Sequence, residues 1–121
     1  MIEDDLRGLL DGAMDVDVYS RLIPLDLPEC VTVQEIGGDH VDAGIRRTSH
    51  TITVMAVSSV QATAIQRMKF ARNYLIRNIP ATIGATHYYT AVPMADGSLK
   101  MKALNGPRYV EYVDMQVVAS I

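Results

Sequence analysis

The chain has 121 residues and a mass of 13.3 kDa, a length that suits one folding unit around one core. Hydrophobic residues make up 49% and charged residues 21%, which is typical of globular rather than disordered chains. The formal net charge of −3 disfavours a general nucleic-acid binder, which needs clustered Lys and Arg, and no apolar run reaches the roughly 20 residues that cross a bilayer.

The first segment predicts a short amphipathic helix. Acidic residues occupy its first turn, where they complement the positive end of the helix dipole. Gly12 is the predicted stop, because glycine readily adopts the left-handed conformation that follows a helix end. The apolar residues at helical spacing are Ile2, Leu6, Leu9, Leu10 and Met14.

Extended structure is predicted next. Residues 16–19 begin an extended stretch, and two prolines mark residues 22–28 as an edge or a connection, because proline cannot donate to a sheet ladder. Residues 30–36 form a predicted strand rich in β-branched side chains, and the Gly-Gly-Asp run at 37–39 predicts a turn.

A polar segment separates this strand from the next one. Residues 39–49 have no apolar rhythm, whereas residues 51–58 alternate as a strand does. The pattern predicts a hairpin with a long protruding loop near residues 37–50, which carries Arg46 and Arg47. Loops of that length within a domain are usually functional or disordered.

Residues 60–78 give the strongest helix prediction, and Pro80 ends it. Phe70 and Tyr74 fall beside the apolar stripe, although amphipathic helices normally keep large aromatic side chains on the buried face. The apolar stripe consists of Val60, Ala64, Met68, Ala71, Leu75 and Ile79. The positions expected in solvent are Gln66, Lys69, Asn73 and Arg77.

The last third predicts strands and turns. Residues 87–94 form a strand, Asp96-Gly97 a hairpin turn, and residues 99–103 a short return strand. A turn at residues 105–107 then leads into a final strand at 108–119. The element order predicts one α+β domain over residues 1–121. We expect a mainly antiparallel sheet of roughly four to six strands, covered on one face by the N-terminal helix and the long central helix.

Candidate chemistry is sparse. The three histidines lack the spacing of a compact zinc site. Asp39, His40 and Asp42 come nearest to a metal or acid–base cluster, but a solvated loop has the same composition. Cys30 begins a β-rich run, where a buried inert thiol is the default, and a single cysteine fits a reducing compartment. The acidic start of the chain lacks the positive region of a secretion signal. No catalytic residue, cofactor or metal is predicted.

Contact residues are the remaining candidates, because aromatic and arginine side chains concentrate at interfaces. Phe70 and Tyr74 either fill the core beneath a second helix or form a subunit contact. Arg46 and Arg47 form either a solvated tip or a contact to an acidic neighbour, such as the acidic N-terminus of another copy. Neighbouring tyrosines in the strand at 87–94 point to opposite faces, so at least one leaves the core side. The candidate interface residues are Arg46, Arg47, Phe70, Tyr74, Arg77, Tyr88 and Tyr89.

A pattern of short signatures runs along nearly the whole chain. A strand ending in Gly37-Gly38 and a polar loop lead to Thr51-Ile52-Thr53-Val54, and one long helix follows. The earlier and later signatures are the N-terminal helix, Val18-Tyr19, Ile23-Pro24, Leu27-Pro28 and, before the last strand, Asn105-Gly106-Pro107-Arg108-Tyr109. In this pattern the chain resembles the tail terminator (tail-completion, or minor tail) proteins of long-tailed bacteriophages and related prophages.

The resemblance implies a structural virion protein that is not an enzyme. Such proteins form a ring, usually of six copies, at the head-proximal end of the tail tube, where they stop tube polymerisation and offer a surface to head-completion proteins. The implied partners are further copies of the chain, the tail-tube protein and the neck proteins, with no cofactor, no membrane and no direct nucleic-acid specificity. The implied location is the neck end of the virion tail, after synthesis in the host bacterial cytoplasm.

Two alternatives stay open at this point. In the first alternative, the chain is another virion connector, such as a head-completion or tail-tube component. In the second, it is a small α+β ligand-binding or enzymatic homo-oligomer. The second alternative would use Asp39, His40 and His87 near a subunit boundary.

Overall fold

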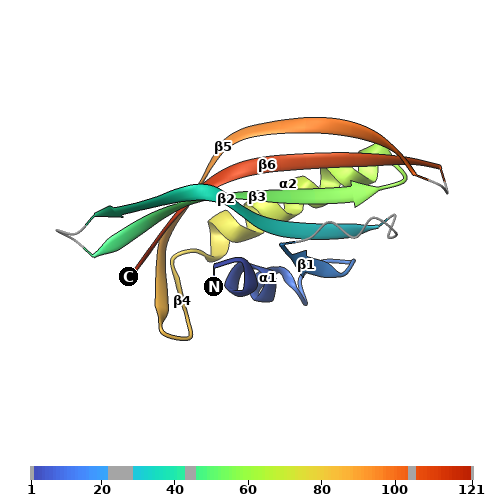
Figure 1. Ribbon diagram of the computed structural model, residues 1–121. Helices are drawn as coiled ribbons and strands as arrows, with labels where there is room; N and C mark the ends of the chain where they lie inside the picture. The colour runs from blue at the N-terminus through green and yellow to red at the C-terminus, as the bar shows by residue number, and fades with distance from the viewer. Residues whose placement is uncertain (1, 22–28, 43–45, 104–105, 121) are drawn as a thin grey trace.

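The computed structural model describes residues 2–21, 29–42, 46–103 and 106–120, and within these ranges the side chains of residues 38–42 and 101–103 are left out of the description. One six-stranded sheet and two α-helices make up the described residues (Figure 1). In chain order the elements are α1 (Ile2–Leu10), β1 (Val18–Ser20), β2 (Cys30–Asp42), β3 (Arg47–Ser58), α2 (Gln61–Asn78), β4 (Ala81–Ile83), β5 (Thr86–Ala103) and β6 (Gly106–Ser120).

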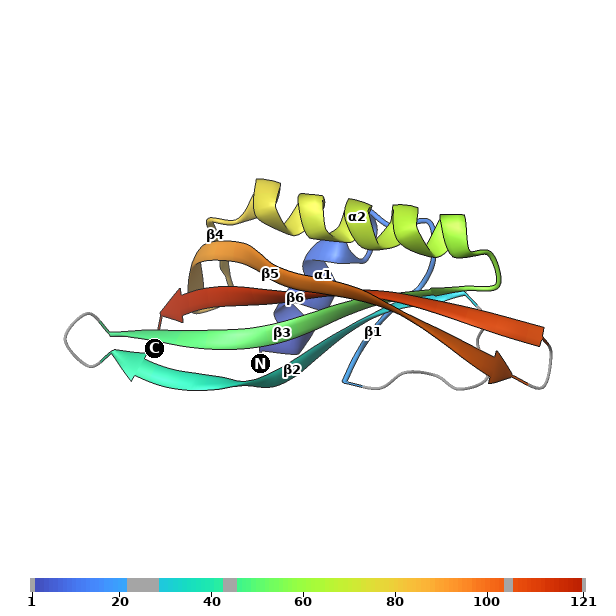
Figure 2. The same ribbon diagram turned by 90° about the horizontal axis from the view of Figure 1, so that it is seen from above.

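The sheet is mixed but mainly antiparallel. Its strand order is β1-β2-β3-β6-β5-β4, in which β1 runs parallel to β2 and every other neighbouring pair is antiparallel. Figure 1 shows α1 and β1 along one edge of the sheet and β5 along the other, where the short β4 pairs with the first residues of β5. Figure 2 shows α2 and α1 on the same side of the sheet. This arrangement agrees with the predicted α+β class.

The core lies between the sheet and the two helices. Alternate residues of β2, β3 and β6 face the helices, as the two-residue period of a strand requires. Within α2 the predicted apolar stripe is buried from Ala64 to Leu75, and Ile79 behind the helix is buried too. Val60 departs from the prediction: it precedes the helix and remains 53% exposed. The core residues of the two helices are Ile2, Leu6, Leu10, Met68, Ala71 and Leu75.

The predicted hairpin turn at Asp96-Gly97 is wrong. Both residues lie inside β5, an 18-residue strand, where Asp96 pairs with Val113 and Gly97 pairs with Tyr112 of β6. The glycine serves a different purpose there, because the Tyr112 ring lies directly over it and a Cβ would come within 2.5 Å of the ring carbon Cζ. A glycine inside a strand often marks such a close approach. The second predicted turn begins at residue 105, outside the described residues, and Gly106 already belongs to β6.

The predicted loop near residues 37–50 is mostly strand. β2 continues to Asp42 and β3 begins at Arg47, with the backbone pairs His40–Ser49 and Asp42–Arg47 and an irregular register around Gly37. Figures 1 and 2 show this end of β2 and β3 extending away from the helices, with β3 paired to β6 as far as Arg47 and Ser120. The residues here show no apolar alternation in the sequence. Residues 43–45 and the predicted connection at 22–28 lie outside the described residues, and β4 had no sequence signal of its own.

Candidate functional site

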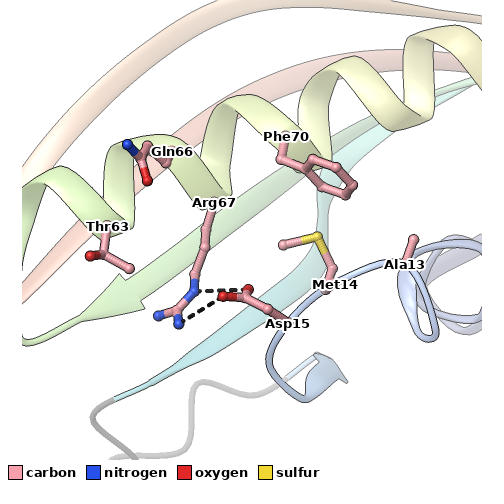
Figure 3. Close-up of a pocket in the computed structure, with 7 residues that line it drawn as sticks. All are labelled: Ala13, Met14, Asp15, Thr63, Gln66, Arg67 and Phe70. Carbon is pink, nitrogen blue, oxygen red and sulfur yellow. Dashed lines mark hydrogen bonds and ion pairs between the residues drawn. The ribbon is translucent and has the colours of Figure 1, made fainter.

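A pocket of about 240 Å³ lies between α2 and the segment that follows α1 (Figure 3). Met14 and Phe70 form an apolar side of it, and the ion pair between Asp15 and Arg67 forms a polar side. The complete lining is Ala13, Met14, Asp15, Thr63, Gln66, Arg67 and Phe70.

Arg67 connects α2 to two other segments. Its Nε and Nη2 donate to the two carboxylate oxygens of Asp15 at 3.1 and 3.2 Å, and its Nη1 lies 3.3 Å from a carboxylate oxygen of Glu29. The Arg67 side chain is only 13% exposed, whereas that of Asp15 is 67% exposed. The hydrogen bonds from Arg67 lower the pKa of Asp15. Two carboxylates therefore already balance this cation, and its main role is to fix the segment after α1 against α2.

The two aromatic residues of α2 differ in how far they are buried. The Phe70 and Tyr74 rings are stacked with centroids 6.0 Å apart. Tyr74 packs against the core and is half-buried, but Phe70 remains 47% exposed. The sequence left open whether these two residues fill the core or lie at the surface. Tyr74 fills part of the core, whereas Phe70 lies at the surface.

The solvent side of α2 combines cations with apolar side chains. Lys69, Asn73 and Arg77 follow one another at four-residue spacing, and all three are exposed as predicted. Ile76, at 39% exposure, and Phe70 flank this row on either side. We call the set Lys69, Phe70, Asn73, Ile76 and Arg77 the outer α2 face.

A second group of candidate residues lies at the start of β3, beside the turn of the β2–β3 hairpin. The Arg47 guanidinium lies 4.0 Å from the centroid of the Tyr89 ring, a cation–π distance, and the His87 ring meets Tyr89 edge-on at 4.6 Å. His87 also shares a 2.7 Å hydrogen bond with Thr82 of β4. Arg46 is exposed in the turn before β3, with φ of 55°. Sequence reasoning named Arg47 and Tyr89 separately, but it had no signal for their contact, which depends on sheet register.

Tyr88 is a core residue of this fold. Its side chain is 1% exposed and packs in the core, where its hydroxyl donates to Asp5 of α1. Burial, together with the Asp5 carboxylate, raises the pKa of Tyr88. Strand alternation places Tyr88 on the helix side and Tyr89 on the other side, so the prediction that at least one tyrosine leaves the core is confirmed for Tyr89 alone.

The residues of the enzymatic alternative lie only in part within the described structure. The side chains of Asp39, His40 and Asp42 lie outside the described residues, and His87 contacts Tyr89 and Thr82. Among the described residues, no group of three or more His, Cys, Asp or Glu side chains could hold a metal ion. Cys30 is fully buried, as predicted, and burial raises the pKa of its thiol. Neither described helix has the length and apolarity needed to traverse a lipid bilayer.

No protein-family model matches the chain, and no curated protein sequence matches it either. The fold does match a chain in the solved structure "Virion of native gene transfer agent (GTA) particle", with a TM-score of 0.59 and 15% sequence identity. The alignment covers 95% of this chain and 84% of that one. At this identity the likeness is one of fold.

Proposed function

We propose that this chain is a structural virion protein of a long-tailed phage or a related particle, and that it acts as a tail terminator. Copies of it form a ring, of six subunits in the proposed assembly, on the head-proximal end of the tail tube. The ring ends tube polymerisation and provides the surface that joins the tail to the head. Its chemistry is association between surfaces, without catalysis or a cofactor.

The observation that carries the proposal is the fold likeness to a chain of a gene transfer agent virion, which extends over nearly the whole of both chains. The tail terminator resemblance of the sequence is independent of it, because that resemblance rests on short signatures along the chain rather than on overall shape. Together the two support a virion protein, and the sequence signatures favour the tail terminator among virion proteins.

Two exposed surfaces suit the proposed assembly. The outer α2 face presents Phe70 and Arg77 for contacts between copies, and the Phe70 ring is stacked on that of the half-buried Tyr74. The projecting β2–β3 hairpin carries Arg46, and Arg47 with its Tyr89 contact, away from α2. We assign the hairpin to contacts with the tail tube or the neck proteins, because its turn end lies away from α2, which we assign to the contacts between copies.

The test uses the purified full chain and tail tubes assembled from the tube protein. Native mass spectrometry should detect a closed homo-oligomer, either free in solution or on the tubes, and electron microscopy should locate it at one tube end. Further tube protein should then fail to extend the capped end. Binding along the tube wall would favour a tube component, and binding only to the portal or neck would favour a head-completion protein. A chain that neither oligomerises nor binds any of these would contradict the proposal.

A further inference from the structure

Formal charge is segregated between the two helical regions. Residues 2–21 contain six carboxylates and two arginines, whereas α2 contains four cations and no acidic residue. Within one copy the two regions meet at the Asp15–Arg67 ion pair beside the pocket (Figure 3). Asp4, Asp11 and Asp17 in the first region and Lys69 and Arg77 in α2 are exposed to solvent and form no described ion pair between the two regions.

The outer α2 face has charges without a partner in the part of the chain that the structure describes. Lys69 and Arg77 are exposed and form no ion pair with any described residue. Phe70 and Ile76 leave large apolar surfaces exposed beside them, at 47% and 39%. Arginine and aromatic side chains with exposed apolar surface are the composition of an interface core and its rim. A partner for this face needs carboxylates and room for two apolar side chains.

The acidic flank of the same chain has the complementary charge. We use this name for Asp4, Asp11, Asp15 and Asp17, all of which are exposed. Asp4 pairs with Arg21 and Asp15 pairs with Arg67, but Asp11 and Asp17 form no salt bridge within the described ranges. Asp4 lies in α1 and Asp11 follows its last residue, Leu10, whereas Asp15 and Asp17 lie in the segment between α1 and β1. Arg7 donates its Nε to the Val18 carbonyl oxygen.

We propose that the outer α2 face of one copy binds the acidic flank of the next copy, and that this heterologous contact closes the ring. The inference rests on the proposed function, since it names the contact by which that ring forms. A contact between two different patches of one chain generates a ring when its rotation closes. Lys69 and Arg77 then lie opposite Asp11 and Asp17, and Phe70 and Ile76 become buried.

Charge decides which surface of the neighbouring copy fits the outer α2 face. The hairpin surface carries Arg46 and Arg47, so its apposition to a helix without acidic residues would bring like charges together, which costs several kcal/mol. Two α2 faces meeting about a two-fold axis would suffer the same repulsion. The acidic flank has the opposite charge, and its exposed carboxylates at Asp11 and Asp17 form no salt bridge with any described residue.

The test is a charge swap between two variants of the full chain. Lys69→Glu/Arg77→Glu makes the outer α2 face acidic, and Asp11→Lys/Asp17→Lys makes the flank basic. Each variant alone should need at least roughly tenfold more protein to form the ring, because like charges then face each other across every contact. All four side chains are exposed, so circular dichroism should give the wild-type spectrum and an unfolding midpoint close to it.

Mixing the two variants in equal amounts supplies the decisive measurement. An acidic α2 face then meets a basic flank, and a basic α2 face meets an acidic flank, so an alternating ring with an even number of copies has opposite charges at every contact. Native mass spectrometry should detect this mixed ring at wild-type concentrations. Lys69→Glu alone should also weaken the ring, and its matched control is Lys100→Glu, which changes the net charge equally but lies on β5 and should leave ring formation unchanged.

The outcomes separate this inference from the proposed function. A wild-type ring that persists in both variants, or two weakened variants that fail to rescue each other, would overturn the inference and leave the ring itself in place. Loss of the ring in the Lys100→Glu control, with both double variants intact, would transfer the contact to β5. A wild-type chain that forms no ring, even on tail tubes, would overturn both.

Discussion

Replacing Gly97 by alanine tests the position of this glycine beneath an aromatic ring. A Cβ built on Gly97 lies 2.5 Å from Cζ and 2.9 Å from Cε1 of Tyr112, so the ring must be displaced. Overpacking of this kind costs about 1–3 kcal/mol. Alanine also recovers about 0.5–1 kcal/mol, because glycine inside a strand loses more backbone entropy on folding. We expect a net destabilisation of about 1 kcal/mol, equivalent to about 4 °C in the unfolding midpoint.

The effect of Gly97→Ala on the unfolding free energy should change sign when the Tyr112 ring is removed. In a Tyr112→Ala background the new methyl group meets no ring, so Gly97→Ala should stabilise the fold by about 0.5–1 kcal/mol. The coupling between the two sites should therefore be about 1–3 kcal/mol. Urea unfolding of the four proteins, followed by far-ultraviolet circular dichroism at a concentration where copies do not associate, measures this cycle.

A hairpin turn at Asp96-Gly97 would give a different result. If Gly97 lay in a turn with positive φ, its replacement by alanine would destabilise the fold to the same extent with or without the Tyr112→Ala substitution. The cost would then arise from strain in the backbone at residue 97. Equal destabilisation with and without the Tyr112 ring would therefore refute the continuous strand β5.

Three further substitutions address the helices and the core. Phe70→Ala should leave the unfolding free energy within about 0.5–1 kcal/mol of wild type, since half of the ring is in solvent, but should weaken ring formation; unfolding instead would make it a core residue. Asp15→Asn should cost less than about 1 kcal/mol at pH 7, because the carboxylate is exposed. The lowered pKa of Asp15 makes its contribution present above about pH 4 and lost as pH falls, so a deficit that persists at pH 2 would contradict the Arg67 pairing. Tyr88→Phe should cost about 1.5–3 kcal/mol, because it leaves the Asp5 carboxylate without its donor. The raised pKa of Tyr88 keeps its contribution intact below about pH 10 and removes it at higher pH, so wild type should lose stability there and the variant should lose less.

The sequence was informative wherever one face of an element is buried. The α2 stripe from Ala64 to Leu75 and the row of solvated polar residues follow from helical periodicity, whereas the position of Phe70 was left open between core and surface. Alternation likewise identified the buried face of the last strand, at Val113 and the residues that follow it in steps of two. Periodicity reports a contrast between two environments, and these elements have that contrast.

The errors arose where that contrast is weak or where a local rule competed with it. The β2–β3 hairpin extends away from the helices, so its residues near His40 show no alternation and were predicted as a loop. The Asp96-Gly97 pair matches the strongest short hairpin signal, yet pairing along β6 overrides it. A glycine is needed at position 97 because the Tyr112 ring of the neighbouring strand lies against it. The sequence pattern alone does not show that these two residues are in contact.

The candidate surfaces were predictable only in part. Arg77 and Phe70 could be named from the α2 pattern, but the contact between Arg47 and Tyr89 requires the register of three strands. The acidic residues at 2–21 and the cations of α2 are visible in the sequence, whereas their location on separate exposed surfaces depends on how α1 and α2 lie against the sheet.

Tail length in particles made without this protein tests the central proposal most directly. Particles should be produced from a genome in which the gene is deleted and from the same genome complemented with the intact chain, and their tails measured by electron microscopy. A ring that ends tube growth predicts overlong tails of variable length, separate from heads, which return to uniform joined tails on complementation. Tails of normal length joined to heads in the absence of the protein would contradict the account.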